Sequence, residues 1–201
     1  SEYRSNLFSV VQQFFVLKDE KSLKKALQLI LDKSIEKKDS LHIAKTFSIL
    51  GNQYINEGQN DSAYYYLLKS EKLFLKLKDS LNLSKNYLDK SYVQLYENDY
   101  TGSELSSIQA LSYYKNLNDK QSEYLALNLI GICSNELKNY DNALIYHKKA
   151  LDYVNKYEEI ANSKLHFRAS SLNNLGYVYQ NINNHKEAVN TFRDALKEKN
   201  L

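Results

Sequence analysis

Residues 124–151 read YLALNLIGICSNELKNYDNALIYHKKAL, and residues 169–196 read ASSLNNLGYVYQNINNHKEAVNTFRDAL. The two stretches align when one is displaced by 45 positions, so that Gly131 matches Gly176 and Ala150 matches Ala195. In both, apolar residues recur at the three- and four-residue spacing of a helix, and a polar cluster divides the stretch in two. Each stretch therefore predicts a helix, a turn and a second helix.

The same unit continues toward the N-terminus at an interval of 40 residues. The string Lys-Asp-Ser-Leu occurs at 38–41 and again at 78–81. Asp39, Asp79 and Asp119 each precede an apolar-periodic segment, where Asp or the following residue can cap a helix. Small residues that allow close contact between helices recur at two places in each repeat, at Gly51, Ser91 and Gly131 and at Ser70, Ala110 and Ala150. The longer final interval predicts a five-residue insertion around 156–162.

The composition agrees with a helical and folded chain. The 201 residues include no Pro and five Gly, which argues against a fold built from strands and tight turns. A hydrophobic content of 43% is enough to fill a core. A net charge of +3 predicts no direct nucleic-acid partner, and no apolar stretch approaches the roughly 20 residues of a membrane span.

The repeated pattern resembles the tetratricopeptide repeat. In the two C-terminal repeats it is carried by Leu127, Ile130-Gly131, Tyr140, Ala143, His147 and Ala150-Leu151, and by Leu172, Leu175-Gly176, Tyr179, His185, Ala188, Phe192 and Ala195-Leu196. Two departures stand out, since the period here is 40 residues against about 34 in the family and the usual closing proline is missing. Both are typical of the longer-repeat variants common in bacterial regulators.

The resemblance implies an all-α, right-handed superhelical solenoid of five antiparallel helix pairs. Residues 1–201 would form one domain, because a single helix pair cannot bury its apolar face and must stack on its neighbours. The expected repeats cover approximately residues 4–38, 39–78, 79–118, 119–160 and 163–201.

The resemblance also implies that the first helix of each pair lines a concave face. The residues expected on that face are rich in amide and aromatic side chains, which suit the main chain and side chains of a peptide. They are Gln12, Lys45, Asn52, Asn56, Lys85, Tyr92, Tyr96, Asn128, Asn135, Asn173, Tyr177, Gln180 and Asn181. An inert, solvated face is the alternative, because Asn, Lys and Tyr are abundant throughout the chain.

No residue pattern predicts catalysis, a metal site or a cofactor. The four histidines, His42, His147, His166 and His185, fall in different repeats without metal-ligand spacing. Packing explains His147 better than ligation does, because the family prefers an aromatic residue there. Cys133 has no base set beside it by the sequence and is expected to pack as a small apolar side chain. We therefore expect no enzyme.

The preferred function is a protein- or peptide-binding module, the sensory or scaffold part of a larger bacterial regulatory protein. A peptide-pheromone receptor, which would lose its peptide on Asn128→Ala or Asn173→Ala, is the second hypothesis, and an enzyme on a helical scaffold is the third. The apolar stripe on the last helix predicts either a further helix after Leu201 or self-association through this end. The compartment stays open.

Overall fold

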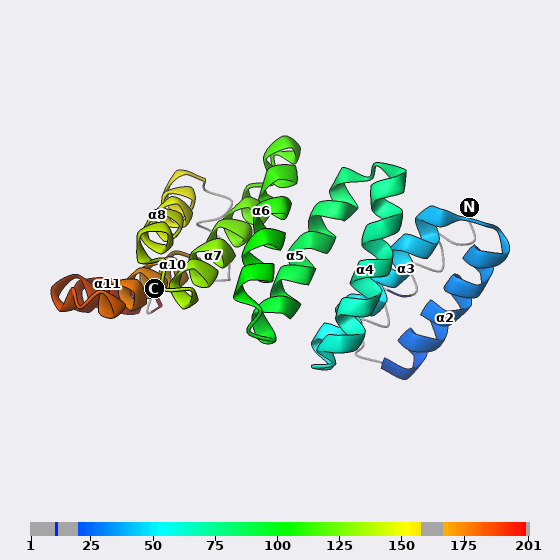
Figure 1. Cartoon of the computed structure of the whole chain (residues 1–201), viewed down its shortest axis with the longest axis horizontal. Coiled ribbons are helices and arrows are strands. Elements are labelled where there is room, and N and C mark those ends of the chain that lie inside the picture. Colours follow the sequence, from blue (N-terminus) through cyan, green and yellow to red (C-terminus); the bar gives the residue numbers. More distant parts are fainter. Residues whose placement is uncertain (1–10, 12–19, 158–166, 200–201) are drawn as a thin grey trace. The chain divides into compact units, whose positions relative to one another are not determined.

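The computed structural model describes Val11, residues 20–157 and residues 167–199, and all regular structure in these residues is helical (Figure 1). The chain divides into two compact units, an N-terminal unit of Ser1–Asp89 and a C-terminal unit of Lys90–Leu201. The division falls inside helix α5 (Ser80–Tyr96). The all-α repeat expected from the sequence is confirmed.

The N-terminal unit contains α2 (Glu20–Glu36), α3 (Ser40–Asn56), α4 (Asn60–Leu77) and the first part of α5. Helix α3 packs against both α2 and α4. Leu27 and Ile30 of α2 are fully buried in a cluster that also includes Val11 and Leu50. This cluster forms the hydrophobic interior next to α2.

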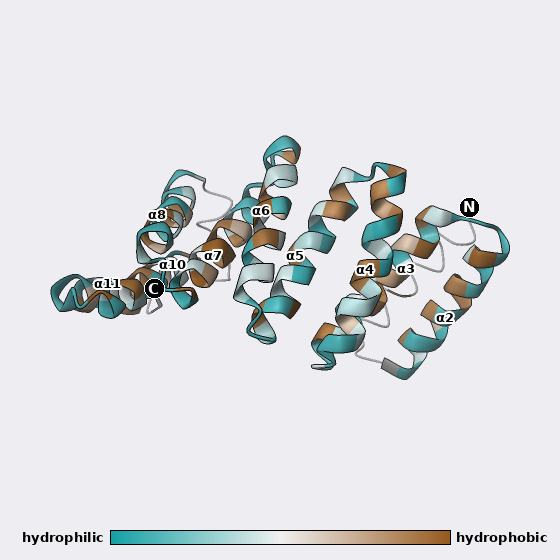
Figure 2. Cartoon of the chain, in the orientation of Figure 1, coloured by the Kyte–Doolittle hydropathy of each residue, from teal (hydrophilic) through white to brown (hydrophobic). Residues whose placement is uncertain are grey.

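The C-terminal unit contains the rest of α5, α6 (Tyr100–Leu117), α7 (Lys120–Glu136), α8 (Tyr140–Lys156), α10 (Phe167–Asn181) and α11 (His185–Lys199). Consecutive helices from α6 to α8 pack against each other, α8 packs against α10, and α10 packs against α11. Figure 2 shows hydrophobic and hydrophilic residues alternating along each helix, as expected for helices that bury one stripe. Every helix of this unit contributes buried apolar residues, for example Tyr114 on α6, Leu129 on α7 and Val178 on α10.

The turns between helices share one backbone design. Each has a left-handed residue two positions before the next helix begins, namely Lys38, Gly58, Lys78, Asn98, Asn118, Lys138 and Asn183. Paired backbone bonds close the preceding helix, as where Lys138 N–H donates to Asn135 O at 3.0 Å and Asn139 N–H donates to Ser134 O at 2.8 Å. This is the Schellman arrangement, which usually carries Gly at the left-handed position. Lys or Asn takes this position in six of the seven turns, so few glycines are needed.

The residue after the left-handed position caps the next helix at Asp39, Asp79 and Asp119, as the sequence predicts, whereas Gln59 makes no side-chain cap. The Asp119 side chain accepts a hydrogen bond from Ser122 N–H at 3.0 Å, and the Asp39 side chain accepts one from His42 N–H at 3.2 Å. Asp79 accepts from the backbone of Asn82 at 3.1 Å. These bonds satisfy backbone groups that a helix start leaves without partners.

The predicted close contacts occur within the helix pairs. A methyl group added to Gly51 would lie 2.9 Å from the Leu67 side chain, and one added to Gly176 would lie 2.6 Å from the ring of Phe192. In both pairs the contacted residue follows the glycine by sixteen positions. The same spacing joins Gly131 to His147, whose ring would lie 2.6 Å from an added methyl group. In these three pairs the glycine leaves the space that the bulky side chain of the second helix occupies.

A buried tyrosine joins α7 to α10. The hydroxyl of Tyr124 donates to the Phe167 carbonyl at 2.9 Å and lies 3.1 Å from the Ser171 hydroxyl. The rings of Tyr124 and Phe167 are 4.5 Å apart between centroids. Burial raises the pKa of Tyr124 to about 12, so its hydroxyl stays protonated. The contact positions α10 against α7.

The insertion predicted around 156–162 falls largely outside the described residues. Helix α8 ends at Lys156, and Tyr157 has an extended backbone with φ of −113° and ψ of 111°. Gln12 also lies outside the described residues. None of the helices in the described ranges has the length and apolar character of a membrane span.

Candidate functional site

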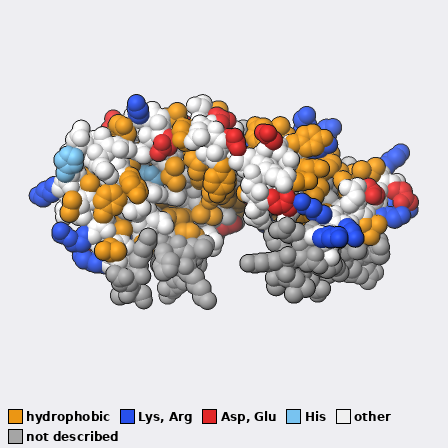
Figure 3. Space-filling model, turned by 90° about the horizontal axis from the view of Figure 1, so that it is seen from below, with side chains coloured by type: hydrophobic (Ala, Val, Ile, Leu, Met, Phe, Trp, Pro, Cys, Tyr) orange, Lys and Arg blue, Asp and Glu red, His pale blue; other side chains and the backbone are white. Residues whose placement is uncertain are grey.

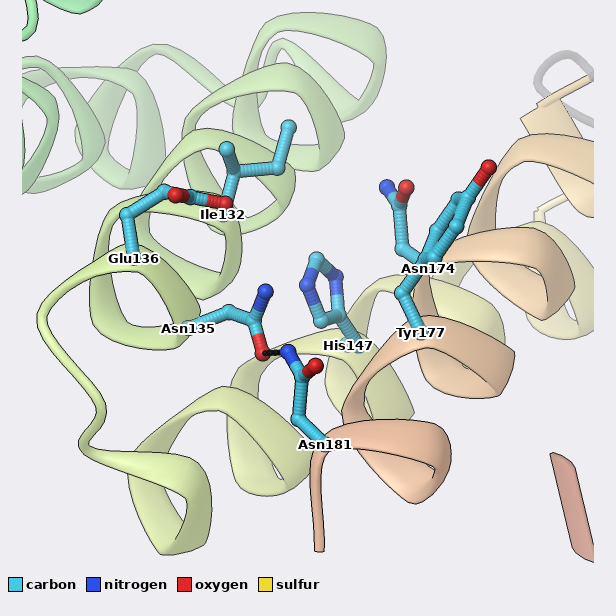
Figure 4. Close-up of a pocket in the computed structure, with 7 residues that line it drawn as sticks. All are labelled: Ile132, Asn135, Glu136, His147, Asn174, Tyr177 and Asn181. Carbon is cyan, nitrogen blue, oxygen red and sulfur yellow. Dashed lines mark hydrogen bonds between the residues drawn. The ribbon is translucent and has the colours of Figure 1, made fainter. Parts of the chain in front are cut away.

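A pocket lies between α7, α8 and α10 of the C-terminal unit (Figure 4). It has a volume of about 430 Å³. Helix α7 contributes Ile132, Asn135 and Glu136, helix α8 contributes His147, and helix α10 contributes Asn174, Tyr177 and Asn181. The pocket therefore combines amide groups, one carboxylate, one imidazole and one phenol ring.

Two amide bridges connect α7 to α10 at this site. Asn181 Nδ2 donates to Asn135 Oδ1 at 3.0 Å, and Asn174 Nδ2 donates to Asn128 Oδ1 at 2.8 Å. Within each helix the two bridging residues are seven positions apart, so they occupy the same face two turns apart. The bridges thus form a regular row of amide groups beside and within the pocket.

His147 is the most deeply buried polar group of the pocket. Its side chain is 1% exposed, and Nδ1 has no hydrogen-bond partner among the described residues. Figure 4 shows the ring standing between Asn135 on one side and Asn174 and Tyr177 on the other. Burial lowers the pKa of His147 to about 4, and a hydrogen bond to the Gly131 backbone opposes this shift. The imidazole is therefore neutral at pH 7.

The other lining residues differ in exposure. The Tyr177 ring is 52% exposed and meets the ring of Phe192 edge-on, with centroids 5.2 Å apart. Glu136 is exposed, and Ile132 is partly buried. No Lys or Arg lines the pocket. A buried acceptor or donor, His147, thus lies beneath a rim of amides, a carboxylate and an aromatic face.

The structure brings together part of the concave face predicted from the sequence. Asn135, Tyr177 and Asn181 line the pocket, and Asn128 lies in the adjoining amide bridge. Asn173 is partly buried and Gln180 is exposed, and both lie outside the pocket lining. Tyr92 and Tyr96 belong to the part of α5 in the C-terminal unit, where Tyr96 is 60% exposed. The binding role of all these residues stays a prediction.

Two of the predicted residues of the N-terminal unit, Asn52 and Lys85, act on one carboxylate. Asn52 of α3 hydrogen-bonds to Asp89 of α5, and the positive charge of Lys85 acts on the same carboxylate. Burial outweighs both and raises the pKa of Asp89 to about 7. Lys45 is partly buried and Asn56 is exposed.

The sequence interpretation missed Ile132, Glu136 and Asn174 and assigned His147 to packing alone. Asn174 had one available signal, because Asn174 and Asn181 repeat the seven-residue spacing of Asn128 and Asn135. No signal in the sequence shows that a nitrogen of His147 is left without a partner. That depends on what α7 and α10 place beside the ring.

Outside the pocket, the reactive thiol of Cys133 is buried and the potential metal ligands of the described residues are dispersed. Cys133 is fully buried, and its burial raises the pKa of the thiol, so the thiolate is disfavoured at neutral pH. Within residues 20–157 and 167–199, no three His, Cys, Asp or Glu side chains are grouped as metal ligands would be. On the face shown in Figure 3, basic and acidic side chains both occur in small separate groups.

Comparison with known proteins relates the chain to helical-repeat proteins. A family model described as tetratricopeptide repeat matches residues 122–197, which include the whole pocket. No curated protein sequence matches the chain.

Several solved structures have the same fold. The apo form of RapI has a TM-score of 0.86 at 20% identity, with 98% of this chain and 70% of that chain covered. BtubC (BKLC) from P. vanneervenii has a TM-score of 0.84 at 17% identity, covering 97% of this chain and 79% of that chain. A Rap protein complexed with competence and sporulation factor has a TM-score of 0.71 at 14% identity, covering 96% and 52%. At these identities the likeness concerns the fold alone.

Proposed function

Because the chain is a tetratricopeptide-repeat protein, we propose that it binds a protein or peptide segment through the C-terminal unit. The contact surface consists of the pocket together with the two amide bridges, Asn128–Asn174 and Asn135–Asn181. The ligand is an extended peptide segment whose main chain meets the bridges.

The spacing of the bridges carries this proposal. Seven residues of α-helix rise about 10.5 Å, and three residues of an extended chain span about 10 Å. Peptide residues three positions apart can therefore meet the two bridges in succession. An amide group has two N–H donors and an oxygen that accepts twice, which is more than one bridge uses. The bridging residues thus support each other and still offer hydrogen bonds to a ligand.

Peptide selection against the full chain tests the proposal. A random peptide library is panned on the protein, and the affinity of the selected peptides is measured by calorimetry. Asn128→Ala and Asn174→Ala are expected to weaken binding at least about tenfold, which corresponds to the loss of a hydrogen bond and its bridge. Asn190→Ala on the exposed face of α11 is the matched control. Equal affinity in all four proteins would contradict the proposed surface.

The same experiment compares neighbouring positions on α10. Asn173 was expected from the sequence to contact the ligand, whereas Asn174 makes the bridge to Asn128. A loss of affinity in Asn174→Ala but not in Asn173→Ala would place the binding face on the bridge. The reverse result would support the face expected from the sequence.

The finer function we propose is the sensory or scaffold part of a larger bacterial regulatory protein, with a peptide-pheromone receptor as the second candidate. The receptor is favoured by the fold shared with RapI and with a Rap protein that was solved in complex with competence and sporulation factor. It predicts that one short peptide binds at micromolar or lower concentration, whereas a scaffold predicts a folded protein partner. Peptide selection and affinity purification with the full chain distinguish the two.

Catalysis is the least supported function. His147 is the imidazole of the pocket, and a base whose pKa is about 4 accepts a proton poorly at neutral pH. Within the N-terminal unit, Asp89 has an amide, Asn52, and a positive charge, Lys85, acting on it rather than a nucleophile beside a base. We therefore keep the expectation of a non-catalytic protein.

Self-association through α11 stays a second property to test. Val189 is 53% exposed and Leu196 is 61% exposed on this helix. Val189→Lys together with Leu196→Lys is expected to lower the solution mass if these residues join two copies. A monomeric mass for the unchanged protein would contradict self-association.

A further inference from the structure

We propose that the pocket between α7, α8 and α10 holds an arginine side chain of the bound peptide, with Tyr177, Glu136 and His147 as its contacts. This inference rests on the proposed function and adds the residue type that the pocket selects. It depends on the hydrogen-bonding capacity, the charge and the shape of the lining.

The hydrogen-bonding capacity comes from His147. The buried Nδ1 atom has no partner among the described residues, and such a group costs about 1–3 kcal/mol when it stays unpaired. The bond to the Gly131 backbone raises the pKa of the ring, so the imidazole is the donor in that bond. A neutral imidazole has one donor nitrogen and one acceptor nitrogen. The other nitrogen is therefore an acceptor, which a ligand can pair only with an N–H or O–H group that displaces the atoms now covering it.

The charge of the lining favours a cation. Glu136 contributes a carboxylate, the asparagines contribute carbonyl oxygens, and no Lys or Arg lines the pocket. An anionic side chain would find only amide N–H groups and the Tyr177 hydroxyl as donors there and would be repelled by Glu136. A peptide carboxylate is therefore excluded, and a guanidinium or an ammonium is favoured.

The shape of the lining favours arginine over lysine. The ring of Tyr177 is half exposed, so a planar guanidinium can stack on it. A guanidinium also has five N–H donors, which suit several acceptors placed around one space. An ammonium is a compact charge and uses this arrangement less well.

Five peptides with the sequence Ac-Ala-Ala-Xaa-Ala-Ala-NH₂ test the inference against the full chain. The central residue is Arg, Lys, citrulline, Gln or Glu, and citrulline has nearly the shape of Arg without its charge. Binding is followed by NMR through the imidazole signals of His147 and the side-chain amide signals of Asn135 and Asn181. We expect the Arg peptide to bind at least about fivefold more tightly than citrulline and Gln, and the Glu peptide to cause no shift.

Two variants separate the contributions of charge and hydrogen bonding. Glu136→Gln is expected to remove the preference for Arg over citrulline while leaving the citrulline affinity unchanged. His147→Phe is expected to weaken the Arg and citrulline peptides alike, about threefold or more, because both lose an acceptor. The fold should tolerate this second change, because Phe192 already occupies the equivalent place beside Gly176.

The results overturn the inference in distinct ways. Equal binding of the Arg, Gln and Glu peptides would reject it, and so would an Arg preference that both variants retain. If library-selected peptides bind in a manner sensitive to Asn128→Ala and Asn174→Ala but show no preference for a basic residue, the inference fails and the proposed function stands. If neither the pentapeptides nor the selected peptides bind, both fail.

Discussion

The hairpins α7–α8 and α10–α11 have the same framework and differ in one buried contact. In the first, Gly131 packs against the ring of His147, and in the second, Gly176 packs against the ring of Phe192. His147 is 1% exposed, whereas Phe192 is partly buried. The same sixteen-residue separation thus places a polar ring beside the glycine in one hairpin and an apolar ring in the other.

The difference shows that the framework does not decide which ring it holds. A phenylalanine ring needs only apolar surroundings. The imidazole of His147 is buried in its neutral form, and its Nδ1 atom has no hydrogen-bond partner among the described residues. Burying an unpaired polar group is unfavourable, so the pair containing His147 is less stable than it would be with an apolar ring. This unfavourable burial occurs at the pocket, where a hydrogen bond from a ligand can offset it.

Acidification should show most clearly how the burial of neutral His147 affects stability. The folded pKa of His147 is about 4 against 6.5 for an unperturbed histidine, so below pH 6.5 only the unfolded chain takes up the proton. Stability should therefore fall between pH 6.5 and pH 4, by about 3 kcal/mol. Urea unfolding at several pH values measures this for the unchanged protein and for His147→Phe, which should lack this part of the loss.

Comparing the unchanged protein with His147→Phe also cancels the contribution of Asp89 to the pH dependence of stability. The pKa of Asp89 is raised from 3.8 to about 7, so its contribution is present at low pH and is lost as the pH rises through this range. That sign is opposite to the sign for His147, and it is the same in both proteins. Equal losses of stability on acidification in the two proteins would show that His147 is not buried in its neutral form.

Alanine at the two glycines should have unequal effects. A methyl group on Gly131 would lie 2.6 Å from a fully buried ring, and overpacking of this kind costs about 2 kcal/mol. The methyl group of Gly176→Ala would meet Phe192 at the same distance, but that ring is partly exposed and can move outward. Thermal unfolding should therefore show a larger loss for Gly131→Ala. A larger loss for Gly176→Ala would reverse the comparison.

Tyr124→Phe tests the contact that joins the two hairpins. The change removes the hydrogen bonds to Phe167 and Ser171 without removing the ring, and should cost about 1 kcal/mol. Chemical denaturation measures the loss, and Tyr96→Phe, at a ring that is 60% exposed, is the control. If the amide signals of Asn135 and Asn181 also shift, the contact helps to position the pocket. No loss of stability would mean that ring packing alone holds α10 against α7.

The smallest effect is expected in the turns of the two hairpins. Lys138 in the first turn has a φ of 61°, and Asn183 in the second has a φ of 60°. This conformation strains most residues with a Cβ but is readily adopted by glycine and tolerated by asparagine. Lys138→Gly should therefore stabilise the protein by about 0.5 kcal/mol, and Asn183→Gly by less. Differential scanning calorimetry ranks the two, and destabilisation in either would contradict the strain argument.

The sequence contained most of the information for the fold. The signals that predicted it are local, and each has the predicted role. They are the 40-residue intervals, the aspartates at 39, 79 and 119, and the glycines at 51, 131 and 176. They are reliable because a helix cap depends on a few adjacent residues. The helix contact depends on one glycine and the residue sixteen positions later.

The site was less predictable because it depends on helix rotation. Successive residues of a helix are about 100° apart around its axis. Choosing Asn173 instead of its neighbour Asn174 therefore turns the predicted face away from the amide bridge with Asn128. Helices α10 and α11 also follow α7 and α8 at a longer interval than that between the other repeats, and the number of added residues does not fix the rotation of α10.

The glycine contacts have a consequence for how such repeats diversify. Leu67, His147 and Phe192 differ in size, aromaticity and polarity, yet each is accepted sixteen residues after its glycine. This position therefore accepts different kinds of side chain within the same helix pair. One substitution there can change the polarity of the side chain that a repeat presents. Ligand preference can therefore evolve one repeat at a time.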